Sequence, residues 1–169
     1  MDKAAFSYQT FKEDIKNWVI KNFKPDSTIL DVGAGSGTYS KLLGKFFPNI
    51  DAVEIYGPNI TDYNLFSLYR FVSNRSIVGL EYPFYDLIIF GDVIEHLSVE
   101  DAQKVLEYAS ERCHDLIVAV PYSYKQEGNE NEHEHHIQSD LTQENVLERY
   151  PVLKPLFIDK RYGYYIKKQ

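Results

Sequence analysis

The segment that most constrains the fold is a short apolar run that passes directly into a glycine-rich turn. Residues 28–32 have the pattern of a buried strand, Gly33, Gly35 and Gly37 follow at once, and residues 38–47 have helical spacing. Glycine permits positive φ angles and lets the backbone approach a ligand closely. The first N–H groups of the following helix are then available to polar groups of that ligand. The pattern predicts a strand–turn–helix unit that binds a ligand at its turn.

Apolar runs and helical patterns continue to alternate along the chain. Strands are expected at 51–55, 71–74, 85–90, 115–120, 156–158 and 164–166, and helices at 7–23, 61–69, from Val99 onward, and at 142–149. The last two strands must pair antiparallel, because a short turn leaves no room for a crossover. The prediction is an α/β fold: a doubly wound, seven-stranded, mostly parallel sheet with a C-terminal antiparallel hairpin and helices on both faces.

The length of 169 residues predicts a single domain, 1–169, with an N-terminal helix in 1–25, a core in 26–169 and a loop or lid at 121–141. The single Cys113 can form neither an internal disulfide nor a thiolate zinc cluster. No apolar run reaches the roughly 18 residues that a membrane span needs, and no signal-peptide pattern begins the chain. We therefore expect a soluble, cytoplasmic protein with no membrane partner.

The net charge makes nucleic acid an unlikely partner. Eighteen Lys and Arg stand against 25 Asp and Glu, which gives −7 at pH 7. A nucleic-acid binder normally neutralises phosphates with a basic face. Oligomeric state is left open by the sequence.

Two further residues, Glu54 and Asp31, restrict the chemical class of the ligand expected at the turn. Glu54 stands at the end of the second strand, 21 residues after Gly33, close to the spacing of an acid that binds ribose hydroxyls. The alternative for Glu54 is a solvated strand end. The glycine spacing differs from that of pyrophosphate-binding turns. Asp31, just before the glycines, would repel a phosphate and favour a cationic ligand.

Three stretches together resemble class I S-adenosylmethionine-dependent methyltransferases. Residues 29–39 (ILDVGAGSGTY) resemble the first motif of that family, residues 53–55 (VEI) the second, and residues 85–97 (YDLIIFGDVIEHL) the fourth. The resemblance extends over roughly residues 28–168 and implies S-adenosylmethionine as cofactor. It does not identify the substrate, for which a small molecule or a polypeptide side chain is expected.

By this resemblance, several residues would hold the cofactor. The backbone around its methionine part would be that of Gly33, Ala34, Gly35 and Gly37. Asp31 would hold the amino end, through water or the amides of the turn, and Glu54 would bind the ribose hydroxyls.

The adenine would lie near three further residues. Ile55 would pack on the ring, and Ser76, followed by Ile77, stands where the family usually has an acid that accepts from the adenine amine. Serine can still accept a hydrogen bond, but it carries no charge.

Asp92 and His96 are candidate catalytic residues at the end of the fourth strand. Asp92 would lie near the sulfonium as a hydrogen-bond acceptor or general base, or would instead cap a short helix that begins at Val93. His96, one helical turn later, would deprotonate an acceptor or bond structurally to a backbone carbonyl.

The loop after the fifth strand contains three His and four Glu within residues 127–136. We expect a lid in which His136 (or His135) contacts the acceptor, with a solvated loop and a divalent-metal site as alternatives. No metal ligand is assigned. An inactive cofactor-binding or regulatory protein, or a metal-dependent enzyme using this loop, are the alternatives to a methyltransferase.

Overall fold

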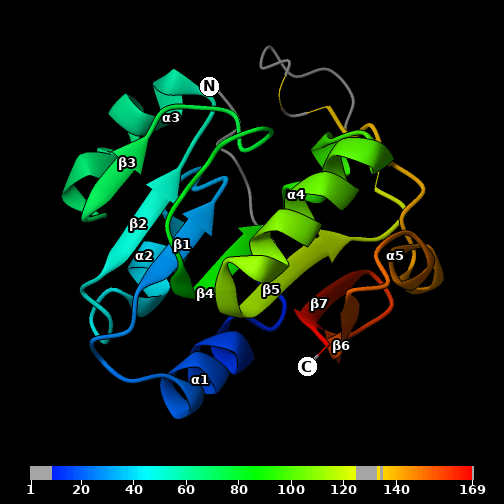
Figure 1. Ribbon diagram of the computed structural model, residues 1–169, viewed down its shortest axis with the longest axis horizontal. Helices are drawn as coiled ribbons and strands as arrows, with labels where there is room; N and C mark the ends of the chain where they lie inside the picture. Colours follow the sequence, from blue (N-terminus) through cyan, green and yellow to red (C-terminus); the bar gives the residue numbers. More distant parts are fainter. Residues whose placement is uncertain (1–8, 125–132, 134, 169) are drawn as a thin grey trace.

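Seven strands form one sheet in the order β3-β2-β1-β4-β5-β7-β6 (Figure 1). The computed structural model describes residues 9–124, 133 and 135–168. The strands are β1 (Ile29–Val32), β2 (Ile50–Val53), β3 (Phe71–Ser73), β4 (Tyr85–Gly91), β5 (Cys113–Pro121), β6 (Leu153–Ile158) and β7 (Tyr162–Lys167). The first five pair in parallel, whereas β7 is antiparallel to both β5 and β6. The predicted α/β sheet with a C-terminal antiparallel hairpin is confirmed.

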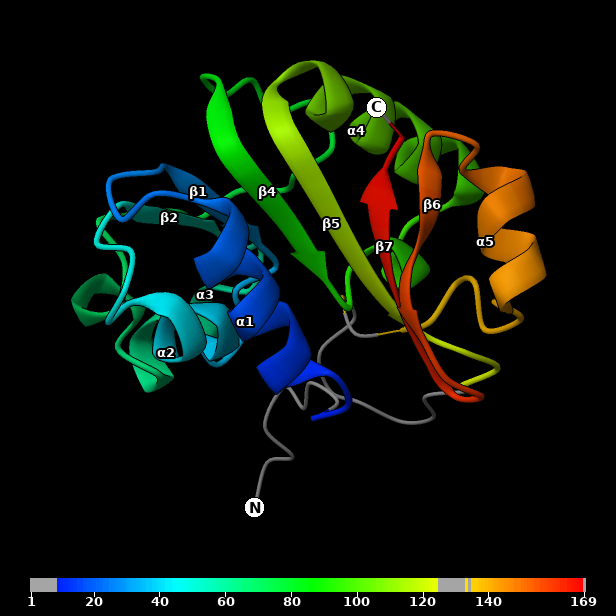
Figure 2. The ribbon, with the colours of Figure 1, turned by 90° about the horizontal axis from the view of Figure 1, so that it is seen from below.

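Helices cover both faces of this sheet, as predicted for a doubly wound fold. They are α1 (Lys12–Asn22), α2 (Thr38–Leu43), α3 (Gly57–Asp62), α4 (Val99–Glu111) and α5 (Gln143–Arg149), with short 3₁₀ helices η1 (Leu65–Ser67) and η2 (Ile94–His96). Buried side chains of α1, α2 and α3 form one core with the sheet, and those of α4 and α5 form the other. Figure 2 shows these two groups of helices on opposite sides of the strands. No helix among the described residues is long and apolar enough to cross a membrane.

The first two helices are shorter than predicted. The expected helix at 7–23 begins at Lys12, because Phe11 has φ 61° in the left-handed region and so cannot continue a right-handed helix. Residues 7 and 8 lie outside the described part of the chain. The helix expected at 38–47 ends at Leu43, and Gly44 follows. Apolar spacing alone did not indicate either boundary.

The helix predicted at 61–69 is wrong. The chain forms α3 earlier, with Pro58 in the first helical turn, where its missing N–H costs nothing. Asn64 then adopts φ 50°, which separates α3 from the 3₁₀ turn η1. A left-handed residue is readily adopted by asparagine, and it redirects the chain toward β3.

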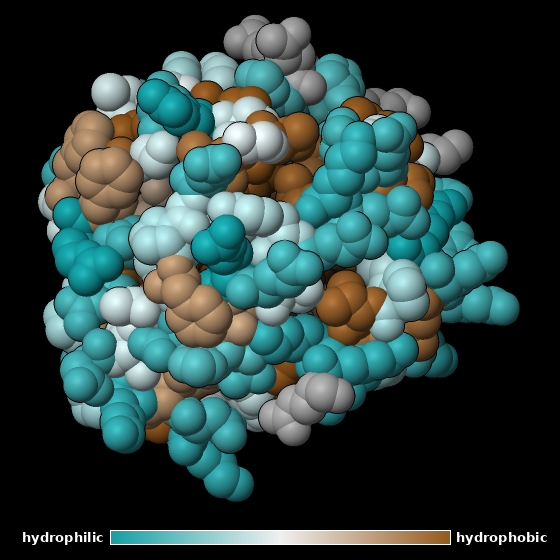
Figure 3. Space-filling model, viewed as in Figure 1, coloured by the Kyte–Doolittle hydropathy of each residue, from teal (hydrophilic) through white to brown (hydrophobic). Residues whose placement is uncertain are grey.

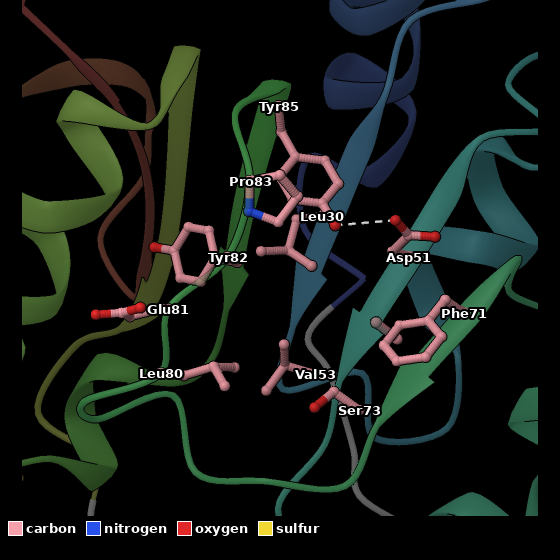
Figure 4. Close-up of a pocket in the computed structure, with 11 residues that line it drawn as sticks. Leu30, Asp51, Val53, Phe71, Ser73, Leu80, Glu81, Tyr82, Pro83 and Tyr85 are labelled. Carbon is pink, nitrogen blue, oxygen red and sulfur yellow. Dashed lines mark hydrogen bonds between the residues drawn. The ribbon is translucent and has the colours of Figure 1, made fainter.

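Residues 74–84, which connect β3 to β4 along the chain, form no helix or strand and cross the same face of the sheet as α4 (Figure 1). A pocket of about 300 Å³ opens there (Figure 4). It is lined by Leu30, Asp51, Ala52, Val53, Phe71, Ser73, Leu80, Glu81, Tyr82, Pro83 and Tyr85. Asp51 accepts hydrogen bonds there from Arg70 and from Tyr85 Oη at 2.9 Å. On the side of the molecule seen in Figure 1, the surface is mostly hydrophilic, with hydrophobic side chains in separate patches (Figure 3).

The start of α4 offers a direct test of local helix capping. Ser98 Oγ accepts from the Asp101 N–H at 3.0 Å and donates to Asp101 Oδ2 at 2.9 Å. Ser98→Ala is expected to lower the free energy of unfolding by about 1 kcal/mol, measured by urea denaturation. Ser98→Asp, which keeps an acceptor at the cap, is the control. Equal stability of the alanine variant and the wild type would contradict the role of this cap.

Candidate functional site

The glycine-rich turn connects β1 to α2 at the carboxyl edge of the parallel strands. Gly33, Gly35 and Gly37 have φ angles of 72°, 52° and 79°, all in the left-handed region that favours glycine. A Cβ at position 33 would lie 2.5 Å from Val93 Cγ2. The turn therefore packs directly against the chain that leaves β4, and position 33 has no room for a side chain.

Glu54 lies beside this turn, immediately after β2. Its side chain is buried, with Oε2 accepting from the Gly35 N–H at 2.7 Å and Oε1 accepting from the Tyr56 N–H at 2.8 Å. A carboxylate offers about four lone-pair positions, so each oxygen keeps one for another donor. The alternative of a solvated strand end is wrong, because Glu54 is 4% exposed.

Asp31 is buried at the end of β1, under the same turn. Its Oδ2 accepts from Tyr69 Oη at 2.5 Å, and its Oδ1 has no hydrogen-bond partner. Burial raises the pKa of Asp31 to about 7, although the bond from Tyr69 and the charge of Lys12 oppose the shift. A buried acceptor without a partner is costly, and a cation that reached Oδ1 would relieve that cost.

The residues predicted for the adenine follow β2 and β3, the two strands next to β1 at one end of the sheet. Ile55 is 41% exposed, whereas Glu54 before it is buried. Asn74 donates to the backbone carbonyls of Glu54 and Ile55 at 2.8 and 3.0 Å. Ser76 Oγ accepts from the Val78 N–H at 3.1 Å. Ile77 is buried in the core that also contains Val53. Sequence reasoning missed Asn74, which ties this segment to β2.

Asp92 follows β4 with φ 58°, a left-handed conformation that asparagine and aspartate tolerate better than most residues. Its Oδ1 accepts from Tyr162 Oη at 2.6 Å. Burial and the Asp92 charge raise the pKa of Tyr162 well above its ordinary value, so the phenol stays a donor. The short helix η2 has Val93 as its N-cap residue, with no side-chain cap. Asp92 therefore precedes the N-cap residue, and its side chain accepts a hydrogen bond from Tyr162 in β7.

A buried lysine, missed by sequence reasoning, lies next to these acids. Lys12 is 4% exposed, and its Nζ donates to Tyr39 Oη at 3.1 Å and to Tyr164 Oη at 2.9 Å. Burial lowers its pKa to about 8, against the attraction of Asp92 and Asp31. The contact joins α1 to β7 across 152 residues of sequence. No local pattern could have indicated it.

The structure brings the two predicted histidines together. The rings of His96 and His136 meet edge to face, with centroids 4.7 Å apart and planes at 89°. His96 Nδ1 lies 3.2 Å from the His135 carbonyl, as the structural alternative for His96 expected, and His136 Nδ1 lies 3.0 Å from the Tyr124 carbonyl. Burial, more than the neighbouring His136, lowers the pKa of His96 to about 4. Burial also lowers the pKa of His136.

Glu95, also missed, completes this group. It is 1% exposed, and neither side-chain oxygen has a hydrogen-bond partner. Burial and the nearby Asp92 charge raise the pKa of Glu95 well above its ordinary value. One side-chain ligand atom each from Glu95, His96 and His136 lie within 4.8 Å of one another. The sequence shows these three residues but not that they lie together, because His136 comes 40 residues after His96.

Gln138 holds the returning chain against η2. Its N–H donates to the Glu95 carbonyl at 3.0 Å, and its side-chain amide donates to the carbonyls of Ile94 and Leu97 at 2.8 and 3.1 Å. The amide oxygen accepts from Tyr150 Oη at 2.7 Å. These hydrogen bonds of the buried Gln138 therefore hold the chain that carries His136 beside His96. Most of the predicted loop at 127–136 lies outside the described residues, apart from 133, 135 and 136.

Comparisons with known proteins match this fold to a group of methyltransferases. No family model matches the sequence, and no curated protein matches it. Among solved structures, an S-adenosylmethionine-dependent methyltransferase from Clostridium acetobutylicum ATCC 824 has a TM-score of 0.72 at 13% identity, covering 97% of this chain and 92% of that chain.

Two further structures show the same similarity. Magnesium protoporphyrin IX methyltransferase (ChlM) from Synechocystis PCC 6803, solved with S-adenosylmethionine bound, has a TM-score of 0.68 at 12% identity, covering 95% of this chain and 79% of that chain. The methyltransferase domain of bacterial CtHen1 has a TM-score of 0.66 at 19% identity, with 95% and 98% covered. The chain therefore has the fold of the class I S-adenosylmethionine-dependent methyltransferases.

Proposed function

We propose that this protein is an S-adenosylmethionine-dependent methyltransferase that acts on a small molecule or a polypeptide side chain. The observation that carries the proposal is Glu54, a buried carboxylate held by the N–H groups of Gly35 and Tyr56. Its two backbone bonds fix the carboxylate and leave one acceptor position on each oxygen. That is the arrangement needed to accept from two adjacent ribose hydroxyls.

The other residues of the turn fit the remaining parts of the same cofactor. Asp31 Oδ1, buried and without a partner, suits the amino group of the methionine part. Gly33, where a Cβ would meet Val93, lets the turn pack directly against the chain that leaves β4. Ile55 offers an exposed apolar surface for the adenine. Ser76 and Ile77 come shortly after Asn74, which donates to the Glu54 and Ile55 carbonyls.

The cofactor supplies the activated methyl group, so the protein has to align the acceptor and exclude water. Asp92 would align the substrate by accepting a hydrogen bond from its hydroxyl or amine group. Tyr162, which donates to Asp92 Oδ1, orients the carboxylate. The buried Lys12 lies close enough to influence Asp92 and Asp31 electrostatically. The net charge of −7 continues to favour acceptors other than nucleic acid.

Calorimetric titration of S-adenosylhomocysteine into chelator-treated protein tests this function. We expect binding of one molecule per chain. In a separate assay without chelator, in which S-adenosylmethionine carries a labelled methyl group, we expect transfer of that group to an acceptor from a screen of hydroxyl and amine compounds. A folded protein that does not bind the compound would overturn the proposal. Binding without transfer to any acceptor would support the inactive cofactor-binding alternative instead.

The affinity for S-adenosylhomocysteine is expected to depend on pH through Asp31. With a pKa raised to about 7 by burial, this carboxyl is neutral in the free protein below pH 7. An ammonium group binds the ionised form, so binding must release the proton at lower pH. Affinity should therefore rise by up to about 100-fold from pH 5 to pH 8, and then level off.

Titrations at both pH values, with the Asp31→Asn variant as the control, measure this effect. The variant should bind more weakly and show no such dependence on pH. Equal affinity of the wild type at pH 5 and pH 8 would contradict the assignment of Asp31 to the amino group.

A further inference from the structure

We propose that Glu95, His96 and His136 bind a divalent transition-metal ion beside the cofactor site. The three residues come from η2 and from the chain that returns after β5, and their ligand atoms lie within 4.8 Å of one another. Two atoms that each coordinate one zinc ion at 2.0–2.2 Å are at most about 4.4 Å apart. Small side-chain rotations therefore suffice to bring all three onto one ion.

Glu95 gives the independent sign that something is bound there. Its carboxyl group is 1% exposed, and both oxygens lack a hydrogen-bond partner. Each buried polar atom without a partner costs free energy, and the neighbouring Asp92 adds a repulsive charge. A divalent cation would satisfy the oxygens of Glu95 and offset the negative charge of both acids.

The hydrogen bonds of the two histidines leave the correct nitrogen for a metal. His96 Nδ1 lies 3.2 Å from one backbone carbonyl and His136 Nδ1 lies 3.0 Å from another. A carbonyl oxygen can only accept, so each Nδ1 must carry the proton. In a neutral imidazole this leaves Nε2 with its lone pair. Fixing the tautomer through a bond to a carbonyl is the arrangement that metal-binding histidines usually have.

The ligand set indicates the class of metal. Imidazole nitrogens suit zinc, iron, cobalt and similar ions, whereas magnesium and calcium prefer oxygen ligands. Two histidines and one carboxylate also leave coordination positions open for water or substrate, as in catalytic zinc sites. The site is thus suited to a bound ion that takes part in a reaction.

The place of the site suggests what the open position binds, and this step rests on the proposed function. Val93 joins Asp92 to η2 and packs against the turn at Gly33, so the metal would lie next to the methyl donor. A hydroxyl oxygen bound to the ion would lose its proton to water more easily. Its lone pair would then form the bond to the methyl carbon while the carbon–sulfur bond breaks and its electron pair stays on sulfur. The acceptor class is therefore an oxygen compound that can coordinate a metal.

Titration of the chelator-treated full chain with CoCl₂, without any cofactor, tests the site directly. We expect one Co²⁺ per chain, with the visible absorption of a cobalt–histidine complex and a rise in Tm. Replacing a residue that only orients a ligand typically weakens metal binding by 10–100-fold. Glu95→Gln and His136→Ala remove ligands, so each should weaken Co²⁺ binding by more than about 100-fold and abolish the rise in Tm.

His114→Ala is the matched control, since His114 is an exposed histidine near Asp86, outside the cluster, and its loss should leave the Co²⁺ affinity unchanged. Thermal unfolding of metal-free Glu95→Gln shows whether that variant is folded. Absence of stoichiometric Co²⁺ binding by the folded wild type, or equal binding by both ligand variants, would overturn the proposal. Because S-adenosylhomocysteine is titrated separately in chelator, failure of the metal site and failure of the proposed function give different results.

Discussion

Glu54→Ala is expected to weaken binding of S-adenosylhomocysteine by at least about 100-fold. The variant loses the two positions that would accept from the ribose hydroxyls, and a hydrogen bond to a charged group contributes about 1.5–3 kcal/mol. Two such bonds correspond to a factor of roughly 10²–10⁴ in affinity. Calorimetric titration in chelator measures this loss.

The structural role of Glu54 has to be separated from its role in binding. In the alanine variant the N–H groups of Gly35 and Tyr56 lose their acceptor, so the turn is also expected to be less stable. Glu54→Gln keeps the shape and one acceptor oxygen, and should give an intermediate affinity. Glu100→Ala removes an exposed acid that pairs with Lys104 at the surface, and should bind like the wild type. Wild-type affinity in the folded Glu54→Ala variant would refute the assignment of the ribose to this residue.

Gly91→Ala is expected to lower the free energy of unfolding by about 3 kcal/mol, the upper end of what overpacking costs. A Cβ at position 91 would lie 2.3 Å from Tyr39 Cε2 and 2.9 Å from its hydroxyl oxygen. Tyr39 cannot move away freely, because it is buried and bonded to Lys12 and Tyr164. The added methyl group therefore has to displace a ring that is held on the other side.

Urea denaturation in two backgrounds isolates this clash. In a Tyr39→Ala background the methyl group of Gly91→Ala meets no ring, so the same substitution should cost much less. Gly57→Ala is the matched control, since its Cβ would meet nothing closer than Asn74 Oδ1 at 3.5 Å, and its effect should stay within about 0.5 kcal/mol. An equal cost of Gly91→Ala in both backgrounds would show that Tyr39 is not the cause.

The strands and the glycine-rich turn could be predicted because their signals are local. The apolar run at 85–90 indicates a covered parallel strand, and it forms most of β4. Two helix boundaries were predicted less well, since each depends on a single left-handed residue. Phe11 and Asn64 adopt positive φ angles that apolar spacing does not reveal.

Some residues of the candidate site could likewise be predicted from local spacing, whereas others could not. Glu54 was predicted from its distance along the chain to Gly33, because one strand–helix–strand unit fixes that spacing. The partner of Asp31 was not predicted, since Tyr69 lies 38 residues away and bonds through its side chain alone. The same holds for Lys12, whose partner Tyr164 belongs to the last strand.

By itself the sequence determined the strands, the glycine-rich turn and the acid that follows β2, since each depends on residues close together in the chain. Only the tertiary structure decided that Glu95 and His96 meet His136, 40 residues further on. That contact depends on how the chain returns from β5 and is held by Gln138 against η2. The spacing of residues in the sequence does not reveal this path of the chain, because side-chain packing and hydrogen bonds across the whole fold determine it.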